Sequence, residues 1–253
     1  HAKIRSVNIH QALSMAGVVA VITGADILAH SKTFITGVKV EAPHYALATD
    51  RVRYVGEPVA IVIAANRYLA EDALEAIAVD YQPLPPIIDP ERAVDATPLH
   101  PGTEGNVLHD RRFRYGDPET AFADAAHVVE ATYSYPRNSC TPIECFCVIA
   151  DYDPGLDAFE ITAKFQGPYT LHTIMARSLK VPGNRMRLKT PPSSGGSFGV
   201  KQAVFPYVVA LGVAARIAGR PVKWLEDRLE HLTAATSSTN RVTNIRAALD
   251  QQG

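Results

Sequence analysis

Short apolar runs, separated by polar and proline-containing segments, divide the first third of the chain into strands and short helices. Runs rich in Val, Ile and Ala, with the length of strands, lie at 4–9, 18–23, 59–64 and 77–81. Residues 67–76 predict a helix because Asn66 stands before them as an N-cap residue. Prolines then crowd residues 83–101. Since proline ends regular structure, we expect a domain boundary in this stretch, between residues 95 and 96.

The rest of the chain again alternates between strand and helix patterns, which indicates an α+β fold. Strands are expected at 128–135, 143–150, 158–164, 185–189, 222–225 and 241–249, and helices at about 118–126, 169–179 and 201–218. Asp117 is expected to cap the first of these helices, and residues 153–155 (DPG) to form a turn. The last helix is apolar on every side, which predicts burial on several sides.

Both ends of the chain predict a longer polypeptide. Residues 4–9 already have the pattern of a strand, and the strand at 241–249 runs into the turn-forming residues DQQG with no return strand after them.

Composition excludes several classes of protein. The chain has 253 residues, of which 47% are hydrophobic and 20% charged, as in a soluble globular protein of one large or two ordinary domains. Its net charge of -1 gives no general attraction for nucleic acid. No continuous apolar run has the length of a membrane span, and the first residues lack the pattern of a signal peptide. We therefore expect a cytoplasmic protein that binds no nucleic acid and has no membrane span.

The three cysteines do not form a recognisable framework. Cys140, Cys145 and Cys147 have neither the even number of a disulfide set nor the spacing of a zinc site. Cys145 and Cys147 lie two residues apart in an expected strand, so they should share one face as packed thiols.

The small-residue loop SSGGSFG at 193–199 is the strongest candidate for a binding site. Three Gly and three Ser leave little side-chain bulk between an expected strand and helix, so main-chain N–H groups can approach a ligand closely. Ser197 breaks the spacing of a dinucleotide-binding loop, and Val200 separates Gly199 from Lys201, which excludes a P-loop. The sequence leaves two interpretations open, a cradle for an anion or polar cofactor edge and a tight turn.

Several segments, in order along the chain, resemble the molybdopterin-binding large subunit of the xanthine dehydrogenase, aldehyde oxidase and carbon monoxide dehydrogenase family. They are VVAVITGADI at 18–27, YVGEPVA at 54–60, AEDA at 70–73, VDYQPLP at 79–85, NV at 106–107, the glycine loop itself and GRPVK at 219–223. The resemblance implies an α/β hammerhead domain in residues 1–95, lacking its first strands. Residues 96–253 would then be the first part of the molybdenum-cofactor-binding domain.

The resemblance also implies cofactors and partners. The chain would bind molybdenum-molybdopterin, in the cytosine dinucleotide form expected of bacterial relatives. Electrons would leave through a 2Fe-2S subunit and an FAD subunit, because three cysteines cannot hold such a cluster motif. Together with the remainder of the large subunit, these partners would form a dimer of heterotrimers.

Site residues follow from the same resemblance. Gln166 matches the Gln that the family places beside molybdenum, where a neutral amide can donate a hydrogen bond without changing protonation. The residues expected to hold the cofactor are Gly195, Gly196, Ser197, Phe198 and Gly199, with Phe198 also against the metal centre. Gln202 stands where purine-oxidising relatives carry a substrate-facing Glu, which makes xanthine a less suitable substrate. As alternatives, Gln166 would cap a helix, Phe198 would lie in the core and Gln202 would be a helix-start residue.

Glu144 resembles part of the family's Pro-hydrophobic-Glu segment, and we expect it to belong to a structural hydrogen-bond network rather than to act as a base. The family's catalytic Glu would lie outside this chain. The sequence thus predicts part of a molybdenum hydroxylase that oxidises an aldehyde or an N-heteroaromatic compound with water as the oxygen source. The alternative is a catalytically silent assembly or binding module of the same fold.

Overall fold

The computed structural model describes residues 1–34, 42 and 44–253. By its internal contacts the chain forms two compact units. The larger unit comprises described residues within 1–36, 43–86 and 139–236, and the smaller unit those within 37–42, 87–138 and 237–253.

Antiparallel strands and short helices make up the first part of the larger unit. Strands β3 (Arg51–Val52), β1 (Ala2–Asn8) and β5 (Ala78–Pro83) form one sheet, and β2 (Val18–Thr23) pairs with β4 (Ala60–Ala64). The helices are α1 (His10–Ser14), α2 (Gly24–His30) and α3 (Arg67–Glu75). Asn66 caps α3 as expected, accepting the Leu69 N–H at 3.0 Å.

A four-stranded mixed sheet forms the second part of the larger unit. Its order is β10 (Val222–Leu225), β7 (Cys147–Asp153), β8 (Ala158–Ala163) and β9 (Met186–Lys189). Strands β7 and β8 are antiparallel and are joined through the expected turn, whereas β8 and β9 are parallel. A parallel pair needs a crossover, and helix α5 (Pro168–Ser178) with the 3-10 turn η1 (Gly183–Arg185) provides it.

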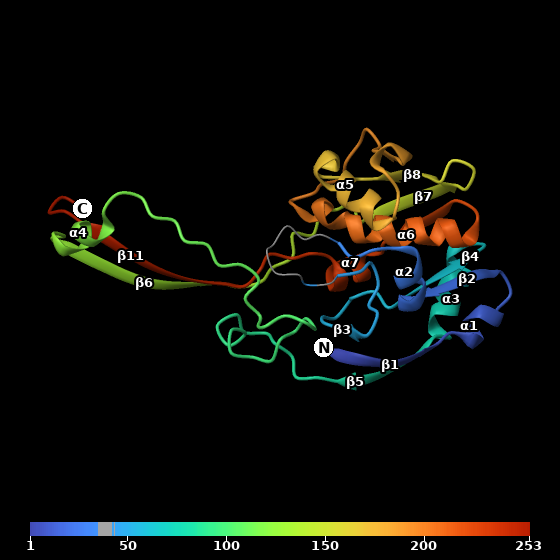
Figure 1. Ribbon diagram of the computed structural model, residues 1–253, viewed down its shortest axis with the longest axis horizontal. Coiled ribbons are helices and arrows are strands. Elements are labelled where there is room, and N and C mark those ends of the chain that lie inside the picture. The colour runs from blue at the N-terminus through green and yellow to red at the C-terminus, as the bar shows by residue number, and fades with distance from the viewer. Residues whose placement is uncertain (35–41, 43) are drawn as a thin grey trace. The chain divides into compact units, whose positions relative to one another are not determined.

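Helix α6 (Phe205–Ala218) is the centre of the core (Figure 1). It contacts β7, β8 and β10 of the four-stranded sheet and also β2 and β4. Residues 208–215 are all buried, which confirms the burial expected from its apolar sequence. By length and composition the segment Val200–Ala218 could cross a membrane, but 61% of its most apolar window is buried inside the protein, as in the core helix of a globular domain.

Three differences from the expected elements have physical reasons. The helix expected from 201 begins as a 3-10 turn, η2 (Val200–Val204), because Ala203 leaves helical angles and Pro206 favours a helix start. The strand expected from 143 begins only at Cys147, because the main chain of 144–146 bonds to residues outside the sheet. The helices α1, α2 and α7 (Arg228–Ala234) were not expected, although Asp227 and Glu230 form a capping box that marks α7.

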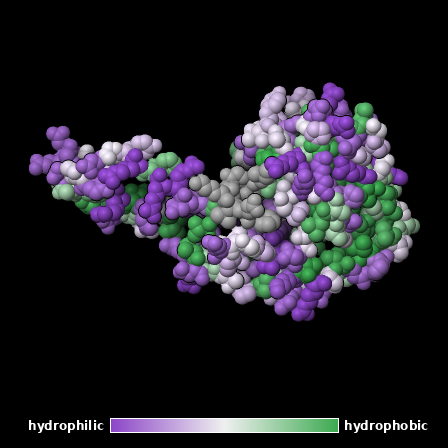
Figure 2. Space-filling model, in the orientation of Figure 1, coloured by the Kyte–Doolittle hydropathy of each residue, from purple (hydrophilic) through white to green (hydrophobic). Residues whose placement is uncertain are grey.

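The smaller unit contains a long two-stranded ribbon. Strand β6 (His127–Tyr135) pairs antiparallel with β11 (Arg241–Leu249) from Tyr135 with Arg241 to His127 with Leu249. Helix α4 (Pro118–Ala123) precedes β6 and is capped by Asp117 as expected. The partner of the last strand is thus a strand more than a hundred residues earlier. Figure 2 shows both apolar and polar residues on the ribbon. Val129 and Tyr133 on β6 are both more than half exposed.

Truncation of Ile161 tests the four-stranded sheet as the core of the larger unit. Ile161 on β8 is fully buried, whereas Ile149 on β7 is 37% exposed. We expect Ile161→Ala to lower the free energy of unfolding by about 2–5 kcal/mol because it opens a cavity, and Ile149→Ala by about 1 kcal/mol or less. Urea unfolding followed by the fluorescence of Trp224, the chain's single tryptophan, measures both. Equal losses would contradict this account of the core.

Candidate cofactor site

One edge of the four-stranded sheet collects every segment of the candidate site. Because β8 and β9 are parallel, with Thr162 beside Lys189, their carboxyl ends meet at the same edge. Gln166 follows β8, and the loop 193–199 follows β9. Strand β7 is antiparallel to β8, so its beginning lies at this edge, with Glu144 just before it. Ligands of such sheets commonly bind at the carboxyl ends of parallel strands.

The side chain of Gln166 is held by the glycine loop. Its Oε1 accepts the N–H of Gly199 at 3.0 Å and also the hydroxyl of Ser197. A backbone N–H can only donate, so these bonds identify which end of the amide is oxygen. The amide nitrogen Nε2 has no hydrogen-bond partner in the described part of the chain. The structure therefore joins Gln166, Ser197 and Gly199 and leaves an amide donor available to a ligand.

The loop backbone has conformations that favour glycine. Gly196 has φ of 106° and Gly199 of 91°, and between them Phe198 has φ of 51°, which is uncommon for a residue with a side chain. Among the described residues, the N–H groups of Gly196, Ser197 and Phe198 donate to no partner. Three consecutive free N–H groups can donate to an anion or to the polar edge of a cofactor.

The side chain of Phe198 is 74% exposed. Burial in the core of the described chain, the alternative that the sequence left open, is therefore wrong. The positive φ of this residue is a conformation found more often at functional sites than in ordinary packing, and its exposed ring can contact a ligand.

Gly195 is needed for the approach of Glu144. A Cβ on Gly195 would lie 2.5 Å from the Cβ of Glu144, closer than real side-chain contacts allow. Glu144 Oε2 accepts the Gly195 N–H at 2.9 Å, and the Glu144 N–H donates to the Gly195 carbonyl at 3.1 Å. Glu144 therefore belongs to a structural network, as expected, although it lies before β7 and not within a strand.

Lys201 is a site residue that the sequence analysis missed. Its side chain is 1% exposed, and its ammonium donates to the carbonyl oxygens of Glu144 at 2.7 Å and Cys145 at 2.8 Å. Its main-chain carbonyl accepts the Gln166 N–H at 3.4 Å. The available signal was a lysine flanked by Val200, Ala203 and Val204 at the start of an apolar helix, where a charge must have partners.

Gln202 lies beside the main chain at Gly167. A Cβ added to Gly167 would sit 3.3 Å from the Gln202 Oε1. The structure thus brings Gln202 next to the residue that follows Gln166. Its role toward a substrate stays a prediction.

A buried Glu226–His231 pair contacts the main chain just before β7, near the same edge of the sheet. Glu226 Oε2 accepts the Phe146 N–H at 2.8 Å and lies 2.7 Å from His231 Nδ1. Cys145 lies nearby, so the three residues have ligand atoms within 4.8 Å of one another. Glu226 Oε2 and His231 Nδ1 are paired with each other, whereas Glu226 Oε1 and His231 Nε2 are buried without a hydrogen-bond partner among the described residues. Burial raises the pKa of the Cys145 thiol, which disfavours the thiolate form that a metal ion would need. We therefore interpret this group as structural.

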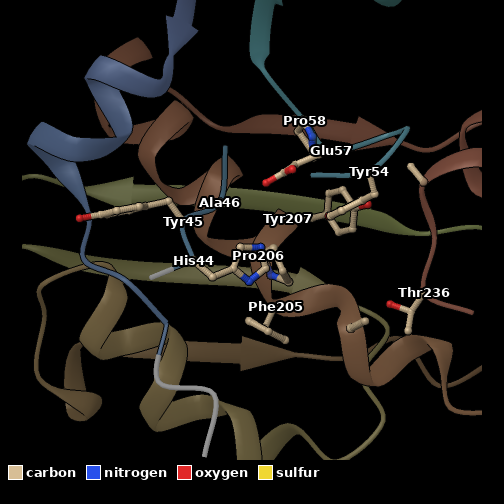
Figure 3. Close-up of a pocket in the computed structure, with 12 residues that line it drawn as sticks. His44, Tyr45, Ala46, Tyr54, Glu57, Pro58, Phe205, Pro206, Tyr207 and Thr236 are labelled. Carbon is tan, nitrogen blue, oxygen red and sulfur yellow. The ribbon is translucent and has the colours of Figure 1, made fainter. Parts of the chain in front are cut away.

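A cavity of about 160 Å³ is lined by residues from 44–58, from the start of α6 and from 234–236 (Figure 3). Its wall includes the aromatic side chains of Tyr54, Phe205 and Tyr207. Its carboxylate, Glu57, is paired with the Arg53 guanidinium at 3.0 Å. Burial raises the pKa of Glu57, and the contacts with Arg53 oppose that shift. Because Glu57 is already occupied by Arg53, this cavity is a weaker candidate for chemistry than the sheet edge.

The sheet edge fits a large polar cofactor. Three main-chain donors without a partner in the described part of the chain, together with the amide of Gln166, can bind oxygen and nitrogen edges of a ligand. The loop carries few side chains that would obstruct them. None of these groups changes charge at neutral pH. The arrangement can therefore bind and orient a redox cofactor whose own chemistry does the reaction.

Comparison with known proteins identifies both parts of the chain. Residues 1–85 match the a/b hammerhead domain of aldehyde oxidase and xanthine dehydrogenase, and residues 99–253 match the molybdopterin cofactor-binding domain. These matches confirm the expected fold: an α+β hammerhead domain followed by part of a molybdenum-cofactor-binding domain. The matched ranges leave 86–98 between them, and the boundary expected between 95 and 96 stays a prediction.

Relatives include subunits of enzyme complexes. The chain is 41% identical over 214 residues to the gamma subunit of the 6-hydroxypseudooxynicotine dehydrogenase complex of Paenarthrobacter nicotinovorans, covering 83% of this chain and 26% of that protein. It is 33% identical to the nicotine 6-hydroxylase large subunit of the same organism, covering 100% of this chain and 32% of that subunit.

The fold also matches a solved structure. Quinoline 2-oxidoreductase from Pseudomonas putida 86 superposes with a TM-score of 0.89 at 30% identity, over 98% of this chain and 32% of the matched chain. The chain thus spans about a quarter to a third of the length of these relatives. It belongs to the molybdopterin-binding large subunits of the xanthine dehydrogenase, aldehyde oxidase and carbon monoxide dehydrogenase family.

Proposed function

We propose that this chain forms one wall of the molybdenum site in a hydroxylase that oxidises an N-heteroaromatic compound or an aldehyde, with water as the oxygen source. One observation supports this most strongly. The Gln166 amide and the free N–H groups of 196–198 lie at the same sheet edge, and the Gly199 N–H orients that amide.

The residues of the site would bind and orient the cofactor. The N–H groups of Gly196, Ser197 and Phe198 would hold its polar edge, and Gly195 and Gly199 would give the loop its close approach. Gln166 would donate from Nε2 toward the metal centre, because its oxygen is already held by the loop. The exposed Phe198 ring would exclude water from the centre. The molybdenum cofactor, when bound, supplies the two-electron oxidation.

Two lines of support favour an N-heteroaromatic substrate over xanthine. Nicotine and quinoline, which appear in the names of two relatives, both contain an aromatic nitrogen ring. Gln202 beside Gly167 offers an amide and no titratable proton, where purine-oxidising relatives carry Glu. An aldehyde remains within the proposal because the hammerhead match is to aldehyde oxidase as well as xanthine dehydrogenase.

Partner subunits would carry the electrons away. Relatives of this chain are named as subunits of complexes. We propose a 2Fe-2S subunit and an FAD subunit, joined with the remainder of the large subunit in a dimer of heterotrimers in the cytoplasm. The cofactor would be the cytosine dinucleotide form.

Metal and pterin analysis of the purified full-length protein tests the proposed function. We expect molybdenum and pterin at about one equivalent each, with reduction of a dye when an N-heteroaromatic compound or an aldehyde is added. A folded protein that contains neither would instead support a catalytically silent assembly module.

Substitution of Gly196 tests the loop. A side chain at Gly196 would be strained at φ 106°, and its Cβ would lie 3.2 Å from Pro142. We expect Gly196→Val in the full-length protein to abolish cofactor retention, measured as molybdenum per protein. The matched control is Gly105→Val, where an added Cβ meets nothing within 4 Å. Unchanged molybdenum content in Gly196→Val would refute the role of the loop.

The isolated 253 residues should show no turnover. The sheet edge supplies binding groups, and the family's catalytic Glu is expected elsewhere in the large subunit. We therefore expect no substrate-dependent dye reduction by the purified fragment, even with added cofactor. Measurable reduction would contradict the assignment of the chain as only one wall of the site.

A further inference from the structure

We propose that Lys201 is the positioning residue of the site: it fixes the beginning of the glycine loop and the main chain of Gln166 relative to each other. The expected effect of Lys201 on cofactor retention rests on the proposed function. Its effect on the position of the loop rests only on contacts within this chain.

The ammonium of Lys201 is buried, donates to two main-chain oxygens and lies beside a carboxylate. The side chain is 1% exposed, and Nζ lies 2.7 Å from the Glu144 carbonyl oxygen, 2.8 Å from that of Cys145 and 3.3 Å from Glu144 Oε1. Two of the three ammonium donors thus have main-chain acceptors, and Glu144 Oε1 lies at ion-pair distance without accepting a hydrogen bond among the described residues. It also lies over the Phe146 ring, 5.3 Å from the centroid. A charge so deeply buried stays in place only with such partners.

Two connections lead from Lys201 to the candidate cofactor site. Through its side chain, Lys201 holds Glu144, and Glu144 in turn exchanges two hydrogen bonds with Gly195 at 2.9 and 3.1 Å. Through its main chain, the Lys201 carbonyl accepts the Gln166 N–H at 3.4 Å. The same 3-10 turn closes the loop, because the Val200 N–H donates to the Ser197 carbonyl at 3.0 Å.

The side chain must be cationic and compact. Methionine at 201 would fill similar space but would remove the donor of the Glu144 and Cys145 carbonyl oxygens and the positive charge beside Glu144 Oε1. Arginine would keep the charge, but its planar guanidinium has a different shape and little room in a site that is 1% exposed. The residue should therefore tolerate Arg in part and Met poorly.

Hydrogen exchange in the full-length holoprotein tests this inference. We expect Lys201→Met to speed hydrogen exchange of the Glu144 and Gly195 amides by about tenfold or more. The hydrogen bonds of these two amides weaken when Lys201 no longer holds Glu144 in place. Amides in β7 and β8 should exchange as in the unsubstituted protein. The molybdenum content per protein should fall in Lys201→Met. In Lys201→Arg, both the molybdenum content and the protection of the two amides should lie between those of Lys201→Met and the unsubstituted protein. Lys223→Met, on the exposed face of β10, is the matched control and should change neither.

The outcomes separate the inference from the proposed function. If Lys201→Met folds and its Glu144 and Gly195 amides stay protected, the positioning role is refuted, whatever the metal content. If the unsubstituted protein holds no molybdenum, the proposed function fails while the exchange result still decides the role of Lys201.

A second variant covers the case in which Lys201→Met unfolds. The double variant Lys201→Met/Glu144→Gln removes the uncompensated carboxylate charge and should fold. Because Glu144→Gln by itself changes the acceptor of the Gly195 N–H, the reference is the single variant Glu144→Gln. Faster exchange at Gly195 in the folded double variant than in Glu144→Gln supports the inference, and equal exchange in the two overturns it. In variants that keep molybdenum, the Mo(V) electron paramagnetic resonance signal should shift, whereas a lysine needed only for stability would leave it unchanged.

Discussion

The parallel pairing of β8 with β9 is the constraint on which the candidate site depends. Parallel neighbours must be joined by a crossover, so the chain leaves the end of β8, passes through α5 and returns to run beside it. The two carboxyl ends then lie together, which brings Gln166 next to a loop that begins some thirty residues later. An antiparallel arrangement would have sent the loop to the opposite edge.

Close packing at that edge depends on a small residue and a buried charge. Glycine at 195 permits the Glu144 side chain to reach the loop, and Lys201 holds Glu144 there. These contacts occupy the beginning of the loop and leave its middle free. The groups that hold the loop in place are therefore different from the N–H groups that remain free to bind a ligand. A rigid support for a few exposed donors is what a preorganised site requires.

Much of the fold could be predicted from the sequence because capping residues, turn residues and apolar patterns act locally, and the structure buries the residues that these patterns mark as apolar. The Asn66 cap, the turn after β7 and the apolar pattern of α6 all depend on neighbouring residues in the chain. The late start of β7 could not be predicted, because residues 144–146 have a strand-like sequence but bond to Gly195, Lys201 and Glu226. Likewise the pairing of β11 with β6 joins segments too distant for any local signal.

The residues proposed for the candidate site came from the sequence, whereas the contacts that support them came from the structure. The glycine loop and Gln166 could be identified from composition and family resemblance, whereas the burial of Lys201 and the orientation of the Gln166 amide are tertiary contacts. An anomalous difference map across the molybdenum absorption edge, from crystals of the full-length protein, tests the central claim most directly. The account predicts a molybdenum peak beside Gln166 Nε2, with the cofactor against the N–H groups of 196–198. A molybdenum peak remote from this sheet edge would contradict it.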